Sequence, residues 1–281
     1  MGDVLAGFHA VWEFESDSVL IRYERGIRTP KLFQVLGERR VPLDAIAGVT
    51  LTRGKRGTVV LRVEPRPGAD PLTEAAAGQL RESGDPYRLV LPAEREVLAE
   101  YYADELTSLL TESGPVERFL VEPPKGPSSF KAYDGKATFD GRTVKFRWSW
   151  TGASSAKWKA GDQTFPVGEL SGVEWRSPEA LEGHLRLVPR DAGVPPAQAD
   201  QDPAAVVFGL GYGPVHESLP FAAAVLAAVR ASSPVTVPAV AARRDPADIA
   251  ERIRHLGELH QAGLVTDEEF SVKKAELLAE L

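Results

Sequence analysis

The chain contains no cysteine. It therefore has no disulfide framework, no thiol nucleophile and no cysteine-ligated zinc or iron–sulfur centre. Its longest unbroken apolar run, Phe221 to Val229, is far shorter than the roughly 18 residues that a membrane span requires. The first ten residues show no cationic patch followed by an apolar stretch, so no secretory signal is expected. We therefore expect a cytoplasmic location, with peripheral contact at a membrane as the alternative.

Length and composition favour a turn-rich protein that contains β-structure. The 281 residues suffice for about two globular units at ~150 residues per domain. Hydrophobic residues make up 43% and charged residues 26% of the chain, as in average globular proteins. The 22 prolines and 25 glycines indicate many turns. Fibrous and wholly disordered proteins are excluded.

The charge is distributed unevenly along the chain. The net charge is −7, yet the segment from Leu20 to Arg62 carries ten basic and three acidic residues. The overall acidity argues against general nucleic-acid binding, and no nucleic-acid partner is expected. The basic segment leaves one local anionic partner open.

An internal repeat organises most of the chain. RRVPLDAIAGVTL (Arg39 to Leu51) aligns with QTFPVGELSGVEW (Gln163 to Trp175) at a constant offset of 124 residues. Farther along, LRVEPR at Leu61 to Arg66 aligns with LRLVPR at Leu185 to Arg190. Two homologous domains explain this offset most simply. Because a slip of one residue would exchange core and solvent faces, we expect the two copies to share one strand register.

Each copy has the pattern of several short strands followed by one helix. Apolar and polar residues alternate in the strand-forming segments of the first copy, and helical spacing begins after Pro92. The expected strands are Ala10 to Glu15, Ser18 to Tyr23, Arg39 to Leu43, Ile46 to Thr52, Thr58 to Glu64 and Tyr87 to Leu91. The first helix, Ala93 to Leu110, should bury Leu98, Tyr102, Leu106 and Leu109. The second, Val215 to Ala231, should bury Leu219, Ala223, Leu226 and Val229. An insertion in the first copy, Asp70 to Asp85, should form one short helix.

The C-terminal segment has the signals of a helical hairpin. Asp245 can cap a helix that begins at Pro246, and Gly263 fits the left-handed position after its end. Thr266 and Glu269 then form a capping box that opens a second helix. A unit below ~40 residues rarely buries enough surface to stand alone, so the apolar stripe predicts self-association into a homo-oligomer. The predicted oligomerisation residues are Ile249, Ile253, Leu256, Leu259, Leu264, Phe270, Leu277 and Leu278.

Five stretches of the sequence resemble known families. PLDAIAGVTL and its repeat PVGELSGVEW, in their order of strands and helix, resemble bacterial pleckstrin-homology-like domains. YERGIRTPKLFQVLGERRVPL and FRWSWTGASSAKWKAGDQTFPV are similar to the actinobacterial domain-of-unknown-function 4429 family. ADIAERIRHLGELHQAGLVTDEEFSVKKAELL resembles the short C-terminal domain called SHOCT. The first resemblance implies bent seven-stranded sheets closed by one helix, in domains that bind phosphoinositides, peptides or proteins.

The expected fold class is α+β. It consists of two tandem pleckstrin-homology-like small β-barrels, each closed by a C-terminal helix, followed by a helical hairpin. The expected boundaries are 5–113 for repeat 1, 114–129 for a linker, 130–231 for repeat 2, 232–244 for a second linker and 245–281 for the SHOCT-like hairpin.

No catalytic, metal or cofactor site is predicted. The glycines of GLGYG (Gly209 to Gly213) lack the spacing of a dinucleotide-binding loop and suit a tight turn instead. GKRGT (Gly54 to Thr58) lacks the first glycine and the hydroxyl residue of a phosphate loop, and is expected to be a charged hairpin turn. The five histidines have no metal-ligand spacing.

Two groups of residues are candidates for binding. One is a basic set in repeat 1, for which an ordinary solvated surface is the alternative interpretation and the one that such charge runs favour. Its members are Arg28, Lys31, Arg39, Arg40, Arg53, Lys55 and Arg56. The other is Lys157, Trp158 and Lys159, where strand-like alternation would send both lysines outward and the tryptophan inward. Phe146, Trp148 and Trp150 form a period-two stripe that is expected to fill the second barrel.

These patterns predict a non-catalytic scaffold or adaptor. Its two repeats would present ligand surfaces to a protein partner, and its hairpin would bring copies together. The first alternative is a peripheral protein that binds anionic lipid head groups through the basic face of repeat 1. The second is an enzyme with an unrecognised site.

Overall fold

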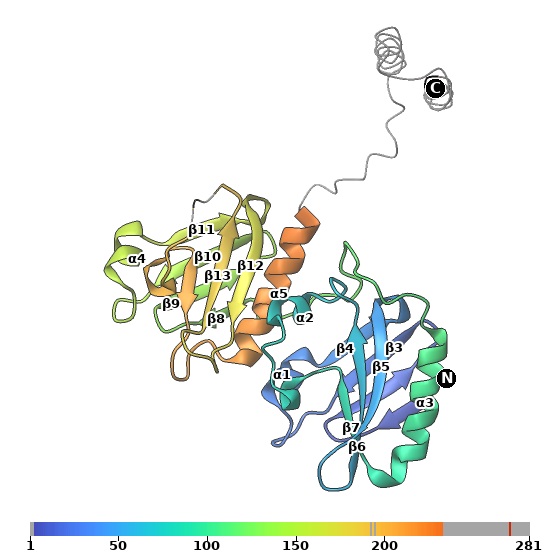
Figure 1. Cartoon of the computed structure of the whole chain (residues 1–281). Helices are drawn as coiled ribbons and strands as arrows, with labels where there is room; N and C mark the ends of the chain where they lie inside the picture. The colour runs from blue at the N-terminus through green and yellow to red at the C-terminus, as the bar shows by residue number, and fades with distance from the viewer. Residues whose placement is uncertain (1–2, 192, 194, 233–269, 271–281) are drawn as a thin grey trace. The chain divides into compact units, whose positions relative to one another are not determined.

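The structure, a computed structural model, describes residues 3–191, 193, 195–232 and 270 (Figure 1). The chain divides into two compact units, Met1–Ser233 and Pro234–Leu281. Apart from Phe270, the predicted oligomerisation residues lie outside the described residues. The first unit is a mixed α/β structure that contains two tandem β domains.

The first repeat contains two antiparallel sheets and a terminal helix. β1 to β4 form one sheet in sequence order, and β5 to β7 form the other. The strands are β1 (Asp3–Ala6), β2 (Ala10–Phe14), β3 (Ser18–Tyr23), β4 (Glu38–Pro42), β5 (Ile46–Arg53), β6 (Thr58–Pro65) and β7 (Arg88–Pro92). The helices are α1 (Lys31–Leu36), α2 (Pro71–Ala76) and α3 (Glu96–Leu109). The expected strands are confirmed to within one or two residues at their ends.

The second repeat follows the same plan. β8 to β11 form a four-stranded sheet and β12 to β14 a three-stranded sheet. The strands are β8 (Ser129–Lys131), β9 (Gly135–Phe139), β10 (Thr143–Trp148), β11 (Gln163–Pro166), β12 (Leu170–Arg176), β13 (His184–Pro189) and β14 (Ala205–Val207). The helices are α4 (Ser155–Ala160) and α5 (Val215–Ser232).

The two repeats share one register, as the offset of 124 predicts. In the β5–β6 pair a bulge lies between Ile46 and Gly48, and in the β12–β13 pair it lies between Leu170 and Gly172. Ile46 and Leu170 are both fully buried. The equivalence extends to the strand ends, because the backbone N–H groups of Arg66 and Arg190 donate to the carbonyls of Ala45 and Glu169.

The repeats differ at the insertion between β6 and β7. Asp70 caps α2 by accepting a hydrogen bond from the backbone N–H of Thr73 at 2.9 Å, and Pro71 occupies the first turn. This helix confirms the expectation for the insertion. In repeat 2, a loop with the short 3-10 turn Ala199–Gln201 occupies the same place in the topology.

Helix α3 buries a different set of residues from the one expected. Its inner face consists of Ala99, Tyr102, Ala103 and Leu106, whereas Leu98 and Leu109 are exposed. This face, which includes two small alanine side chains, packs on β5 and β6, and the two outer leucines lie outside it. The prediction was therefore right for Tyr102 and Leu106 and wrong for Leu98 and Leu109.

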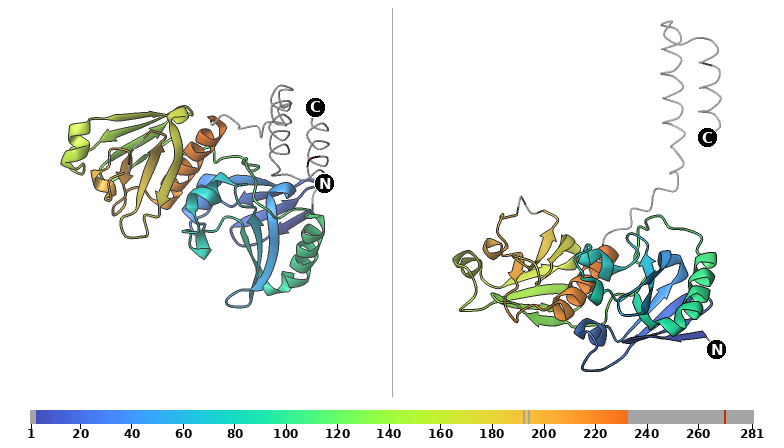
Figure 2. Two further views of the ribbon diagram at one scale, coloured as in Figure 1. Left: turned by 45° about the horizontal axis from the view of Figure 1, so that its top comes forward. Right: turned by 60° about the horizontal axis from the view of Figure 1, so that its bottom comes forward.

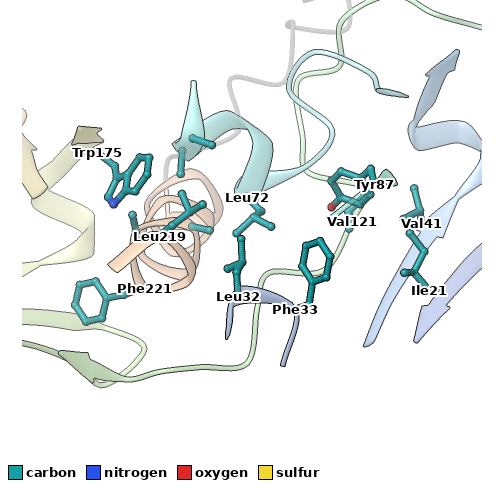
Figure 3. Packing of buried hydrophobic residues seen from close by; sticks show 14 of the residues in the cluster. Ile21, Leu32, Phe33, Val41, Leu72, Tyr87, Val121, Trp175, Leu219 and Phe221 are labelled. Carbon is teal, nitrogen blue, oxygen red and sulfur yellow. The ribbon is translucent and has the colours of Figure 1, made fainter. Parts of the chain in front are cut away.

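Helix α5 is covered on two sides. One side packs on β8 and β12 of its own repeat, and the other contacts α1 and α2 of repeat 1. Figure 3 shows Leu32 and Leu72 of repeat 1 between α5 and the strands that carry Ile21 and Val41. These residues belong to one hydrophobic core that runs through both repeats. A helix that is apolar almost all round is typically buried on several faces, and α5 follows that rule.

Polar contacts add to this junction between the repeats. The side-chain amide of Gln79 donates to the carbonyl of Trp175 at 2.9 Å and accepts from the backbone N–H of Ser177 at 2.9 Å. On α5, the guanidinium of Arg230 donates to the carbonyl of Gly68 at 3.0 Å. Because the core is continuous and the polar groups at its edge are paired, the two repeats form one compact unit.

Among the described residues, no helix combines the length and the apolar character needed to cross a membrane.

Candidate functional site

Two of the five tryptophans are exposed, and they lie together. Trp12, Trp148 and Trp175 are buried, whereas Trp150 is 83% exposed and Trp158 is 50% exposed. The rings of Trp150 and Trp158 meet edge to face, with centroids 5.5 Å apart. Large aromatic side chains usually lie in cores or interfaces, so an exposed pair needs an explanation.

The path of the chain after β10 places this pair on the surface. The strand ends at Trp148, and a turn carries Trp150 before Ser154 caps α4. Gly152 permits the turn, since a Cβ there would lie 2.2 Å from the carbonyl oxygen of Tyr133. The expected period-two stripe is therefore correct for Phe146 and Trp148, which are buried, and wrong for Trp150, which lies beyond the strand.

Lys157 and Trp158 also have the reverse of their expected orientations. The segment forms a helix and not a strand, so Lys157 is fully buried while Trp158 and Lys159 face solvent. Sequence reasoning missed this helix, although Ser154 at its start and Gly161 after its end are the capping residues of a short helix.

A buried ion pair anchors α4 to the rest of the repeat. The Nζ atom of Lys157 lies 2.5 Å from a carboxylate oxygen of Asp134, whose other oxygen accepts the backbone N–H of Val207 at 3.0 Å. The ammonium also lies 5.1 Å from the ring centroid of Trp148. Burial lowers the pKa of Lys157 and raises the pKa of Asp134, and the opposite charge of each partner counters these shifts. This ion pair fixes α4, which carries Trp158 and follows the turn that carries Trp150.

A second pair of aromatic rings lies beside the first. The centroids of Tyr133 and Tyr212 are 6.2 Å apart, and both rings line a cavity of about 350 Å³ together with Thr151, which follows Trp150. Tyr212 belongs to the glycine turn Gly209 to Gly213, which forms as expected. We call Tyr133, Trp150, Trp158 and Tyr212 the aromatic corner.

The segment that carries Tyr133, Trp150 and Trp158 is rich in basic side chains. Residues 129–166 contain seven basic and three acidic residues. Within the described part of the chain, four exposed lysines of this segment have no carboxylate within ion-pair distance. They are Lys131, Lys136, Lys145 and Lys159. The corner therefore combines exposed aromatic rings with unpaired cations.

The members of the predicted basic set of repeat 1 differ in burial and in their ion-pair partners. Arg39 is buried, where its guanidinium lies 2.5 Å from the carboxylate of Asp70 and donates to Tyr87 Oη at 3.0 Å. Burial alone would lower the pKa of Arg39, but Tyr87 and Asp70 together raise it. Burial also raises the pKa of both Tyr23 and Tyr87. Arg39 is a structural residue, and its assignment to a binding surface was wrong.

The other members of the basic set have several different surroundings. Arg40 pairs with Glu15, and Arg53 lies 3.3 Å from Glu96 on α3. The remaining four are exposed and have no carboxylate partner among the described residues. They are Arg28, Lys31, Lys55 and Arg56, the last two in the expected hairpin turn between β5 and β6.

A groove of about 500 Å³ between the β5–β7 sheet and α2 is balanced in charge. Its Arg62 pairs with Asp85 at 2.9 Å, and its Arg88 pairs with Glu82 at 2.6 Å. Among the residues that the structure describes, no cluster of histidine and acidic side chains could hold a metal ion.

Comparison with family models gives two matches. The model described as "Domain of unknown function (DUF4429)" matches residues 12–107 and again residues 137–226. The model described as "Short C-terminal domain" (SHOCT) matches residues 251–278. No curated protein matches the chain. The two matches of the first model fall on the two structural repeats.

Proposed function

We propose that this chain, which belongs to the family of the domain of unknown function DUF4429, is a non-catalytic adaptor whose main ligand surface is the aromatic corner of repeat 2. Each repeat would be a pleckstrin-homology-like domain, since each has a four-stranded and a three-stranded antiparallel sheet followed by a helix. The ligand is a protein. The fused repeats would hold this surface in a fixed orientation.

The exposed tryptophan pair carries this proposal. Tryptophan and tyrosine dominate the binding energy of protein interfaces, and lysine is usually depleted from their centres and found at their rims. The aromatic corner has this arrangement, with Trp150 and Trp158 flanked by Lys159. The ion pair of Lys157 and Asp134 fixes α4 beneath it, so little entropy would be lost when a partner binds.

The double substitution Trp150→Asp/Trp158→Asp tests this surface in the full-length protein. Captured proteins are compared between wild type and variant, and cross-linking locates the contact on the chain. We expect partners to be lost from the variant and to cross-link in wild type within residues 149–160. Leu181→Asp is the control, because Leu181 is as exposed and lies in another turn. Equal capture by both variants would contradict the proposal. The proposal would also be contradicted if the double variant lost binding to anionic vesicles but kept its captured protein partners.

The SHOCT match supports a second part of the proposal, self-association through the C-terminal hairpin. Leu256→Asp/Phe270→Asp in the full-length chain should lower the mass measured by light scattering, because the predicted apolar stripe would carry two charges. Glu258→Lys is the control, since helical spacing puts Glu258 opposite Leu256 and Ile249. An unchanged mass for the double variant would contradict self-association through the hairpin.

A further inference from the structure

The outer face of α3 is a surface on repeat 1 that no other element of the described residues covers. Val97 is 78% exposed and Tyr101 56% exposed, while Leu109, which is also exposed, lies on the flank of the helix beside Glu105. The segment 93–110 holds five acidic residues and one basic residue. The face is therefore apolar at intervals and negatively charged throughout.

A groove lies along this helix. Its apolar lining consists of Phe14, Leu106 and Leu109, and its volume is about 620 Å³. Three acidic residues also line it: Asp3, Glu15 and Glu105. Glu15 is engaged by Arg40, while Asp3 and Glu105 have no cationic partner within the described chain. We call this feature the acidic groove. Its chemistry suits an aromatic side chain that is accompanied by lysines.

The equivalent helix of repeat 2 shows how such a face can be covered. The outer side of α5 contacts α1 and α2 of repeat 1. By the offset of 124, the counterpart of α1 in repeat 2 is α4, the helix that carries Trp158. Within the unit, α1 of repeat 1 thus contacts the terminal helix α5 of repeat 2. The equivalent elements, α4 of repeat 2 and the outer face of the terminal helix α3 of repeat 1, do not contact each other.

Helix α4 and the outer face of α3 cannot meet within one unit. Figures 1 and 2 show α3 and α4 at opposite ends of the first unit in all three views. A contact between them requires a second copy of the chain. Such a contact joins two different surfaces, so it is heterologous and would build either a closed ring or an open chain of copies.

We propose that the aromatic corner of one copy binds the acidic groove and outer face of α3 on a second copy, so that the chains associate head to tail. The inference rests on the proposed function of the corner and names its partner. Trp150 and Trp158 enter the groove against Leu109, and lysines around the corner, Lys159 among them, face Glu105 and Asp3. Charge complementarity selects this pairing over corner to corner or groove to groove, where like charges would meet.

The test uses two full-length variants. The corner variant is Trp150→Asp/Trp158→Asp, and the groove variant is Glu105→Lys/Leu109→Lys. The corner variant keeps an intact groove and the groove variant keeps an intact corner. Copies of the same variant therefore cannot associate head to tail with one another. We expect labelled groove variant to bind unlabelled corner variant with near wild-type affinity, because the intact corner of one meets the intact groove of the other. Binding to unlabelled groove variant should be about 30-fold weaker or more, since a removed interface tryptophan or its partner pocket typically has that effect.

The titration of labelled groove variant with unlabelled groove variant also distinguishes head-to-tail association from association through the C-terminal hairpin. Association through the hairpin would bring any two variants together equally, so only the excess in the mixed titration reports the head-to-tail contact. Equal binding in both titrations would overturn the proposal, even if the corner binds another protein. Loss of vesicle binding by the corner variant, without restored association on mixing, would overturn it in favour of a membrane surface. Circular dichroism checks folding, and Trp158→Ser with Leu109→Ser repeats the test if a charged variant misfolds.

Discussion

Asp134→Ala should lower the free energy of unfolding by about 3–5 kcal/mol, because it leaves the ammonium of Lys157 buried without its counter-charge. Urea unfolding measures the change. Lys157→Met/Asp134→Ala should lose clearly less than the sum of the two single substitutions, since the double variant buries no unpaired charge.

A surface ion pair of the same repeat provides the control. Arg147 lies 3.6 Å from Asp162, and both side chains are largely exposed. Exposed pairs contribute about 0–1 kcal/mol, so Arg147→Ala should have little effect. If Asp134→Ala were as mild as Arg147→Ala, or if the two single effects simply added, the buried pair would not anchor α4.

Leu72→Ala should destabilise both repeats, although Leu72 belongs to the first. Its side chain is fully buried between α2 and α5 (Figure 3), and removal of a buried leucine typically costs about 2–5 kcal/mol. Hydrogen exchange followed by mass spectrometry should show reduced protection in β12 and β13 as well as in β5 and β6.

Leu181→Ala is the matched control for this experiment, because an exposed leucine should change stability by less than about 0.5 kcal/mol. Loss of protection in repeat 1 alone would mean that the repeats unfold independently. The fixed orientation of the aromatic corner relative to α3 would then be lost.

The register of the two repeats was predictable from the sequence, and the physical reason is plain. A strand exposes alternate residues, so a shared offset fixes both the pairing and the buried positions, as Ile46 and Leu170 show. The burial of α5 on several faces was not predicted, because the sequence analysis gave each terminal helix one buried face. Phe221, Ala222 and Val225 are buried in addition to the expected Leu219, Ala223 and Val229.

The candidate site could be predicted only in part. Helices α1 and α4 have six residues each, too few for a helical period to stand out from strand alternation. The burial of Lys157 depends on Asp134, which lies 23 positions earlier and meets it only in the folded chain. For the same reason Arg39 looked like a surface cation, because its partner Asp70 belongs to the insertion. Buried charges are set by tertiary contacts that no local pattern reports.

Site-specific photo-crosslinking from position 158 can locate the contact between two copies of the chain. A photoreactive phenylalanine analogue replaces Trp158 in the full-length chain, and a second chain carries it in place of Leu181 as the control. If the aromatic corner binds α3 of a second copy, position 158 forms cross-links to residues 96–109 of that copy and position 181 does not. Cross-links from position 158 to lipid, to other regions of the chain, or at no higher yield than from position 181 would contradict this contact.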